Sequence, residues 1–520
     1  MYNEGVAVMS SNITNSSSNS SLDIINSSDE QFDEKFPEIL KKVKLKKLQE
    51  LEPSIDEINK VYSIIFKYIK ENKRKIYGGY ALNKLLIDKD KNLALYDETD
   101  IPDIDFYSPD PLSDLANLCE LLQEGGLNSV EGREAQHKET YSIFVNYQLY
   151  CDISYMSNNI FSHVRFLKMD DFHVVHPWFM TIDYFRMFTD PLISYWRLEK
   201  HFHRYKTLEK MYPLPLIKEP VEMIKYNNTG INKAINTLFD YLSENDGLIF
   251  TGFYAYNYYL HISEYNKNNN NYKYISLPYL EVYSDDYIKD GIELIDFIKN
   301  LPKEISSKLS HKEYYPFFQF YGYNVVIYYN DGKEDIPILY MYTTNKKCIP
   351  LKKVNLIKFN NLDIMNPTIN KKKNINIGSF EFNILHALII LVKVRVDEDN
   401  EWNDILYKYI NGIVAFRKYY LNKHNITIYD DSIFQGLVTD CIGKTISPEI
   451  ERKIIIKERK KKGKPLVFRY EPGVSKKPDN YIFLNSSGNI IKNENNMKLN
   501  KKNINDKIED EIEDNIEDNI

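Results

Sequence analysis

The first part of the chain alternates between the hydrophobic period of a helix and that of a strand. Ser54 and Glu57 form a capping-box pair. Apolar residues then recur at helical spacing, which predicts one long helix through Ile58, Val61, Ile65, Tyr68 and Ile69. A short strand over 75–77, a turn at the Gly-Gly pair 78–79 and a helix over 80–86 are predicted next.

A stricter alternation marks residues 101–108, IPDIDFYS, as a strand. It places Asp103 and Asp105 on one face and apolar side chains on the other. A later predicted strand over 149–155 carries a third acid, Asp152. Helix, strand, Gly-Gly turn, helix and two acidic strands together indicate one α+β unit.

The same order of elements returns downstream, which indicates an internal repeat. TGFYAYNYYL at 251–260 is similar to the Gly-Gly segment, and 278–286 and 336–344 are similar to the two acidic strands. In this overlay one glycine is lost, and Asp103 falls on Tyr279, Asp105 on Glu281 and Asp152 on Pro337. The second copy is expected to keep the scaffold without the acids. Chance similarity in a tyrosine-rich chain is the alternative.

Composition narrows the class of protein. Cys119, Cys151, Cys348 and Cys441 stand far apart without a CxxC pair, so neither a disulfide framework nor a structural zinc site is expected. The net charge of -7 decides nothing about nucleic acid, because basic and acidic residues are segregated along the chain. No secretory leader and no apolar run of membrane-spanning length is recognised, so a soluble protein that is not secreted is expected.

Three acids on neighbouring strands repel one another unless a cation neutralises them. Hard divalent cations bind such oxygen ligands, and two of them would support in-line attack at phosphorus. A Gly-Gly pair that opens a helix suits phosphate, because backbone amides can approach it closely. A DxD alone is more often a solvated loop. The combination of Gly-Gly, DxD and a later Asp therefore carries the interpretation.

This combination resembles the motif of the nucleotidyltransferase (DNA polymerase beta) superfamily. Residues 80–102 form a longer spacer than is common there, with Asp97, Glu98 and Asp100 as competing acids. A narrower resemblance covers residues 175–214, VHPWFMTIDYFRMFTDPLISYWRLEKHFHRYKTLEKMYPL. This segment is similar to the one after the third Asp in the poly(A) polymerase catalytic subunits of large DNA viruses, the poxvirus-like and giant-virus group. That family also has a degenerate second copy.

The resemblance implies an α+β fold of two tandem nucleotidyltransferase-like lobes, the first active and the second degenerate, with helical N- and C-terminal elements. The implied catalytic and metal-binding residues are Asp103, Asp105 and Asp152, and the implied nucleotide-binding residues are Gly78, Gly79 and Lys84. The predicted RNA-binding residues are Arg197, Lys200 and Arg204 on one helical face, and Lys460, Lys461 and Lys462 in a basic run. Solvated basic faces are the alternative for both groups.

These patterns divide the chain into five predicted parts. They are a disordered Ser/Asn-rich N-terminus (1–33), a catalytic nucleotidyltransferase domain (34–215), a degenerate nucleotidyltransferase-like domain (216–375), a helical C-terminal part with the basic segment (376–490) and an acidic low-complexity tail (491–520).

The expected reaction is template-independent transfer of AMP from ATP to the 3′ end of mRNA, with two Mg²⁺ or Mn²⁺ ions and release of pyrophosphate. Another terminal nucleotidyltransferase, either CCA-adding or oligo-U, and a catalytically silent RNA-binding scaffold are the alternatives. The viral resemblance implies the virion and the host cytoplasm as locations. A homodimer and a separate processivity subunit stay open as partners, and no membrane is expected.

Overall fold

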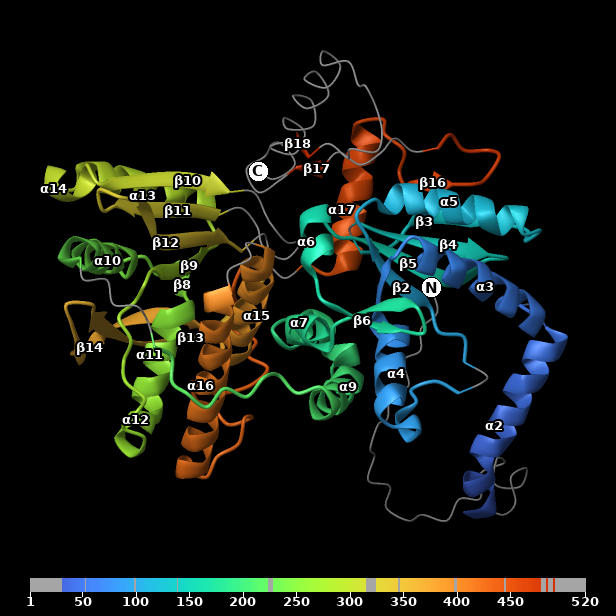
Figure 1. The fold of residues 1–520 in the computed structure, drawn as a ribbon, viewed down its shortest axis with the longest axis horizontal. Coiled ribbons are helices and arrows are strands. Elements are labelled where there is room, and N and C mark those ends of the chain that lie inside the picture. The colour runs from blue at the N-terminus through green and yellow to red at the C-terminus, as the bar shows by residue number, and fades with distance from the viewer. Residues whose placement is uncertain are drawn as a thin grey trace, which may run out of the picture. The chain divides into compact units, whose positions relative to one another are not determined.

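The computed structural model (Figure 1) describes residues 30–51, 53–97, 100–137, 139–222, 228–314, 324–344, 347–396, 400–443, 446–477, 483–484 and 490–491. Most of the predicted disordered N-terminus and acidic tail lies outside these ranges, although α2 (Glu30–Glu50) begins within the former. The chain forms two compact units, residues 1–60 with 96–101 and residues 61–95 with 102–520. The first unit holds α2 and the start of α3 (Ile55–Glu71).

The second unit contains an eight-stranded sheet built mainly from the first half of the chain. Its strands, in spatial order, are β16 (Arg469–Tyr470), β3 (Glu131–Glu134), β4 (Thr140–Val145), β5 (Gln148–Tyr155), β2 (Ile104–Ser108), β1 (Lys75–Tyr77), β7 (Phe172–Val175) and β6 (Phe166–Met169). We call this sheet and its helices the first lobe. The mixed strand directions bring β2 and β5 side by side in parallel.

A second eight-stranded sheet repeats the first. Its order is β10 (Leu309–Tyr314), β11 (Asn324–Asn330), β12 (Asp335–Thr343), β9 (Leu280–Ser284), β8 (Leu248–Phe250), β14 (Asp363–Gly378), β13 (Ile349–Asn360) and β15 (Cys441–Ile442). From β3 to β6 and from β10 to β13, each neighbouring pair runs in the same relative direction. This second lobe confirms the predicted internal repeat.

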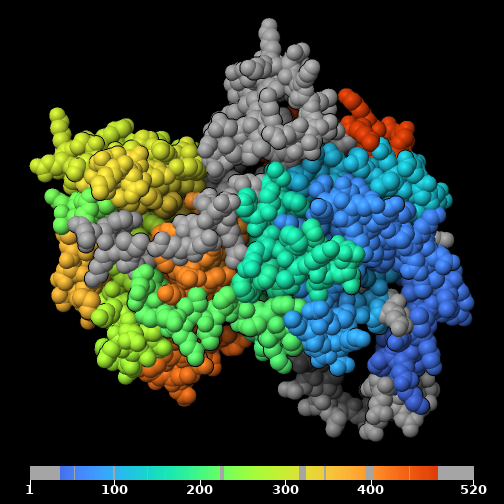
Figure 2. Space-filling view, in the orientation of Figure 1, coloured from blue at the N-terminus to red at the C-terminus, as the bar shows by residue number. Residues whose placement is uncertain are grey.

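Helices precede and follow the strands in both lobes. In the first lobe they are α4 (Gly78–Lys89), α5 (Pro111–Glu124), α6 (Asn158–His163), α7 (Pro177–Phe188), α8 (Pro191–Ser194), the short η2 (Tyr195–Arg197) and α9 (Leu198–Met211). In the second they are α10 (Thr229–Leu242), α11 (Gly252–Ser263), α12 (Tyr265–Asn268), α13 (Tyr287–Asn300), α14 (Lys303–Ser306), α15 (Phe380–Val396) and α16 (Asn400–His424). The equivalent helices α7 and α15 pack against each other. Figure 2 shows the surface of these elements in the same orientation.

Tyrosine fills much of the core of the second lobe. Tyr254 and Tyr259 of α11 are buried, and their hydroxyls donate to the carbonyls of Ile357 (2.7 Å) and Gly378 (2.9 Å). A buried hydroxyl is costly unless it is paired. The rings therefore pack like apolar side chains while their hydroxyls tie α11 to the strands β13 and β14.

The C-terminal part contributes to both lobes. α15 and α16 pack in the second lobe, and β15 extends its sheet beside β13. α17 (Pro448–Lys461) and β16 instead belong to the first lobe, where β16 pairs with β3. Among the described helices, none has the length and apolar character that crossing a bilayer requires.

The cysteines differ from the sequence expectation. Cys348 and Cys441 form a disulfide, with their Cα atoms 5.4 Å apart, whereas Cys119 and Cys151 are buried free thiols. The expectation of no disulfide is therefore wrong for the first pair. Chain spacing concealed the bond because strand pairing between β13 and β15 brings together residues 93 positions apart.

Candidate active site

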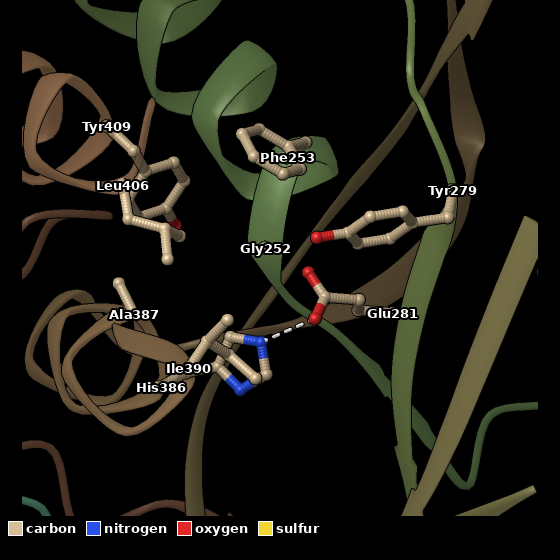
Figure 3. Close-up of a pocket in the computed structure, with 9 residues that line it drawn as sticks. All are labelled: Gly252, Phe253, Tyr279, Glu281, His386, Ala387, Ile390, Leu406 and Tyr409. Carbon is tan, nitrogen blue, oxygen red and sulfur yellow. Dashed lines mark hydrogen bonds and ion pairs between the residues drawn. The ribbon is translucent and has the colours of Figure 1, made fainter. Parts of the chain in front are cut away.

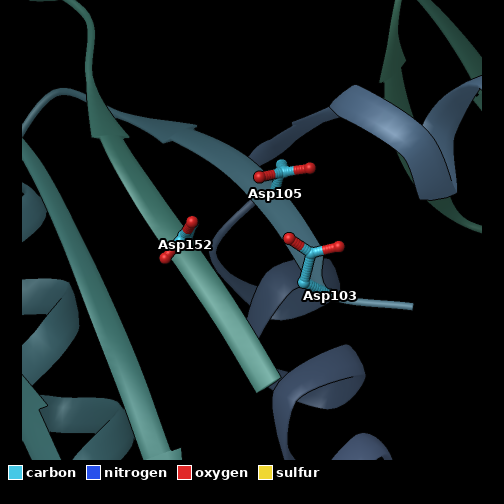
Figure 4. A group of neighbouring side chains, drawn as sticks. All are labelled: Asp103, Asp105 and Asp152. Carbon is cyan, nitrogen blue, oxygen red and sulfur yellow. The ribbon is translucent and has the colours of Figure 1, made fainter. Parts of the chain in front are cut away.

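Three carboxylates meet on the first sheet (Figure 4). β2 and β5 are parallel neighbours in a register that sets Asp105 beside Asp152, and Asp103 lies just before β2 begins. A ligand oxygen from each of the three lies within 4.8 Å of the others. The structure thus brings together the three acids that the sequence singles out.

The electrostatics of the cluster favour a bound cation. Burial, and then the charges of Asp103 and Asp152, hold the pKa of Asp105 well above its usual value. Burial also raises the pKa of Asp152 to about 6, against a hydrogen bond of 2.5 Å from Ser142. Oxygen ligands with surplus negative charge suit a hard divalent ion. The residues present therefore fit a divalent metal.

The Gly-Gly pair lies against this cluster. α4 begins at Gly78, so the helix predicted from residue 80 starts two residues earlier. Gly78 has a φ of +70°, and a Cβ on it would overlap the carboxylate of Asp105. The amide of Gly79 donates to the same carboxylate. The close approach of Asp105 explains why position 78 requires a glycine. Phosphate binding by Gly78 and Gly79 stays a prediction.

Lys84 has a different partner from the one predicted. Its ammonium forms an ion pair of 2.7 Å with Asp170 in the turn between β6 and β7, and lies over the rings of Tyr80 and Phe172. Its charge is already compensated there. A role in binding the nucleotide stays a prediction.

Sequence reasoning missed two charged residues of α7. Asp183 accepts from the hydroxyl of Tyr107 and forms an ion pair of 3.2 Å with Arg186. Tyr107 stacks on Tyr77 with ring centroids 3.9 Å apart, and the charge of Asp183 contributes to the raised pKa of Asp105. A charged pair at i and i+3 inside an apolar helix was the signal available in the sequence.

The predicted basic residues lie in two places. Arg197 ends η2, and Lys200 and Arg204 lie on α9. Burial and the charge of Arg186 lower the pKa of Arg197, and Asp183 opposes this, so Arg197 lies near the charged pair of α7. Whether these residues bind RNA stays a prediction.

The second basic group lies at the end of α17. Lys460 and Lys461 close the helix and Lys462 follows, all exposed. α17 is held to the first lobe by Arg459, which forms an ion pair of 2.7 Å with Glu134 of β3. The lysines are therefore attached to the sheet that carries the acids, and RNA binding by them stays a prediction.

A small pocket lies at the matching point of the second lobe, lined by residues of α11, β9, α15 and α16 (Figure 3). Gly252 has a φ of +61° and faces Glu281 as Gly78 faces Asp105. Glu281 pairs with Nε2 of His386 at 2.8 Å, and both side chains are buried. Phe253 stands where Gly79 would be and packs against Tyr279.

The strand register shifts the sequence overlay of β12 by three residues. Glu281 pairs across the strands with Tyr340, as Asp105 pairs with Asp152. The counterpart of Asp152 is therefore Tyr340 and not Pro337. The second copy also keeps one carboxylate, Glu281, so the expectation that it lacks every acid is wrong.

Comparisons with known proteins agree with this architecture. Residues 63–194 match the family model "Poly(A) polymerase catalytic subunit", and residues 206–501 match the model "APMV, Putative poly(A) polymerase, catalytic subunit, C-terminal". The "Putative poly(A) polymerase catalytic subunit" of Acanthamoeba polyphaga mimivirus is 32% identical over 494 residues, which cover 88% of this chain and 81% of that protein.

Two further relatives extend the comparison. A protein of African swine fever virus is 29% identical over 187 residues, covering 35% of this chain and 38% of its own length. The crystal structure of the Megavirus polyadenylate synthase is 30% identical, with a TM-score of 0.78 over 95% of this chain and 97% of that one. With its acidic cluster and paired lobes, the chain belongs to the family of viral poly(A) polymerase catalytic subunits.

Proposed function

We propose that this chain transfers AMP from ATP to the 3′-hydroxyl of RNA at the cluster of Asp103, Asp105 and Asp152, without a template. The observation that carries the proposal is the convergence of these three carboxylates from two parallel neighbouring strands. The attacking group belongs to the RNA and the leaving group is pyrophosphate, so no protein nucleophile is required.

Divalent ions, Mg²⁺ or Mn²⁺, held by the three aspartates would supply Lewis-acid activation of the hydroxyl and neutralise the triphosphate. The chain's own residues prepare their place. The Gly79 amide fixes Asp105, and Ser142 fixes Asp152 by donating to its carboxylate. Fixed carboxylates reduce the reorganisation that substrate binding would otherwise require.

Two arginines lie close to Asp183, whose charge acts on Asp105: Arg186, its ion-pair partner, and Arg197. Arg186 is held by Asp183, while the buried Nε of Arg197 has no hydrogen-bond partner. An unpaired buried donor is costly unless a ligand satisfies it. We therefore assign these two guanidinium groups to the triphosphate of ATP.

Primer extension tests the proposal. The protein is incubated with RNA and each nucleoside triphosphate separately, with Mg²⁺ or Mn²⁺. Long extension from ATP alone is expected. Incorporation from CTP would indicate a CCA-adding enzyme and a run of residues from UTP an oligo-U transferase, and RNA binding without incorporation under either metal would establish a silent scaffold.

The biological setting belongs to the same proposal. Substrates are the 3′ end of mRNA and ATP, and the expected locations are the virion and the host cytoplasm. For the oligomeric state we favour a homodimer over dependence on a separate processivity subunit, and analytical ultracentrifugation of the purified chain distinguishes the two.

A further inference from the structure

Two adjacent aromatic rings stand free on the surface of the first lobe. Tyr195 is 74% exposed and Trp196 is 71% exposed, both on η2. The other tryptophans are packed, Trp178 against Tyr407 and Trp402 against Phe253. Large exposed rings side by side mark binding surfaces more often than chance placement does.

The neighbours of these rings are cationic. The guanidinium of Arg197 lies 5.2 Å from the ring centroid of Trp196, and Lys200 and Arg204 follow on α9. Within the described part of the chain, neither Lys200 nor Arg204 forms an ion pair with an acid. Unpaired cations beside open aromatic faces suit a single-stranded nucleic acid, whose phosphates and bases they contact respectively.

The two rings are connected to the active site. η2 packs against α8 and α9, and both α8 and α9 pack against α7. α7 carries Asp183 and Arg186, and Arg197 is close enough for both charges to shift its pKa. An RNA strand that leaves the acidic cluster would therefore need only a few nucleotides to reach the rings of Tyr195 and Trp196.

We propose that Tyr195 and Trp196 form a stacking platform for the unpaired bases at the 3′ end of the RNA, with Lys200 and Arg204 holding the adjoining phosphates. The platform rests on the proposed function, because it takes the RNA of that reaction as its ligand. Stacking tolerates any base, since every base has an aromatic face. It would hold the primer while leaving the choice of nucleotide to the ATP site.

Direct RNA binding tests the platform without relying on catalysis. Fluorescence anisotropy is measured with a labelled oligoribonucleotide, and with a matched one whose 3′-terminal nucleotides lack bases. Trp196→Ala should weaken binding of the intact RNA about tenfold, and Trp196→Phe should restore most of it. With the abasic RNA, Trp196→Ala and the unchanged protein should bind alike.

Tyr429→Ala is the matched control, because Tyr429 is 67% exposed in a loop of the second lobe. It should leave RNA binding unchanged. Equal losses on intact and abasic RNA, unchanged binding by Trp196→Ala, or a raised KM for ATP with unchanged RNA binding would each overturn the platform. RNA binding that depends on Trp196 without AMP incorporation would instead overturn the proposed function and leave the platform standing.

Discussion

The two lobes place a carboxylate at equivalent points of their two sheets but give it different neighbours. In the first lobe Asp105 faces two further acids, and its charge needs a cation from outside. In the second lobe Glu281 is paired with His386, a side chain of the protein itself. Asp183 and His386 are each the seventh residue of the equivalent helices α7 and α15. The residue at this helix position therefore differs between the lobe whose carboxylate lies among further acids and the lobe whose carboxylate has a partner within the protein.

The lobes also share an acid that has kept its role. Asp114 is the fourth residue of α5 and Asp290 the fourth of α13. Asp114 accepts from Arg74 and Tyr68, and Asp290 accepts from Ser284 and Asn245. Both are buried. The second lobe thus keeps the buried acid of this helix but lacks the acidic cluster. The fold requires the first kind of acid, whereas the cluster is required only where the reaction is proposed to occur.

The largest expected difference is in the rate of AMP incorporation after substitution of Asp105 or of Glu281. Asp105→Asn should lower AMP incorporation by at least about a hundredfold, because it removes a carboxylate to which the proposed function assigns metal binding. Glu281→Gln should leave the rate per folded molecule within about twofold of the unchanged protein, since no substrate group is assigned to it. Single-turnover extension with ATP measures both. An equal loss in both variants would mean that the second lobe takes part in catalysis.

The next comparison concerns the shared structural acids. Asp114→Ala should cost about 3 to 5 kcal/mol, because Arg74 would be left largely buried without its partner. Asp290→Ala should cost about 1 to 3 kcal/mol, because its partners are uncharged. Thermal denaturation measures both, and a larger loss for Asp290→Ala would contradict the reasoning.

The two turn glycines give a smaller effect. Gly78→Ala and Gly252→Ala should each destabilise by about 1 to 2 kcal/mol, because both residues have positive φ. Only Gly78→Ala should also reduce kcat, since its new methyl group would displace Asp105. Thermal shifts and primer extension on both variants provide the test. A fall in kcat of the same size for Gly252→Ala would count against it.

The smallest effect is a pH dependence of the metal-free first lobe. The folded-state pKa of Asp152 is about 6, above its ordinary value. The folded state thus binds more protons than the unfolded state, and stability falls as pH rises from about 4 to 6. In EDTA, the melting temperature should fall between pH 4 and pH 6 by about 1 to 2 °C more in the unchanged protein than in Asp152→Asn. Identical pH profiles would exclude this contribution.

The order of helices and strands could largely be predicted from the sequence, because the hydrophobic period that distinguishes a helix from a strand is a local signal. The strands β1 and β2 and the helix between them agree with the predicted order. The repeat was visible because the glycine turn and the alternating strand occur twice. The acids of the first lobe were found since DxD lay in a strict alternation.

Long-range pairing could not be predicted in the same way. Tyr340 as the counterpart of Asp152 depends on the register of β9 with β12, which the letters alone do not fix. The Cys348–Cys441 bond and the pairing of Glu281 with His386 join residues far apart in the chain. Arg186 was missed because its i, i+3 pairing with Asp183 is a pattern that solvated helix faces also show, so the pattern alone does not mark a site.

The pairing of β16 with β3 has a consequence for synthesis. β3 is made early, but its neighbour at Arg469–Tyr470 follows the whole second lobe. Until the ribosome has released nearly the entire chain, the edge of the first sheet remains open, and open strand edges recruit other strands. The order of translation therefore leaves this edge of the first lobe open longest, and a segment made after the whole second lobe closes it.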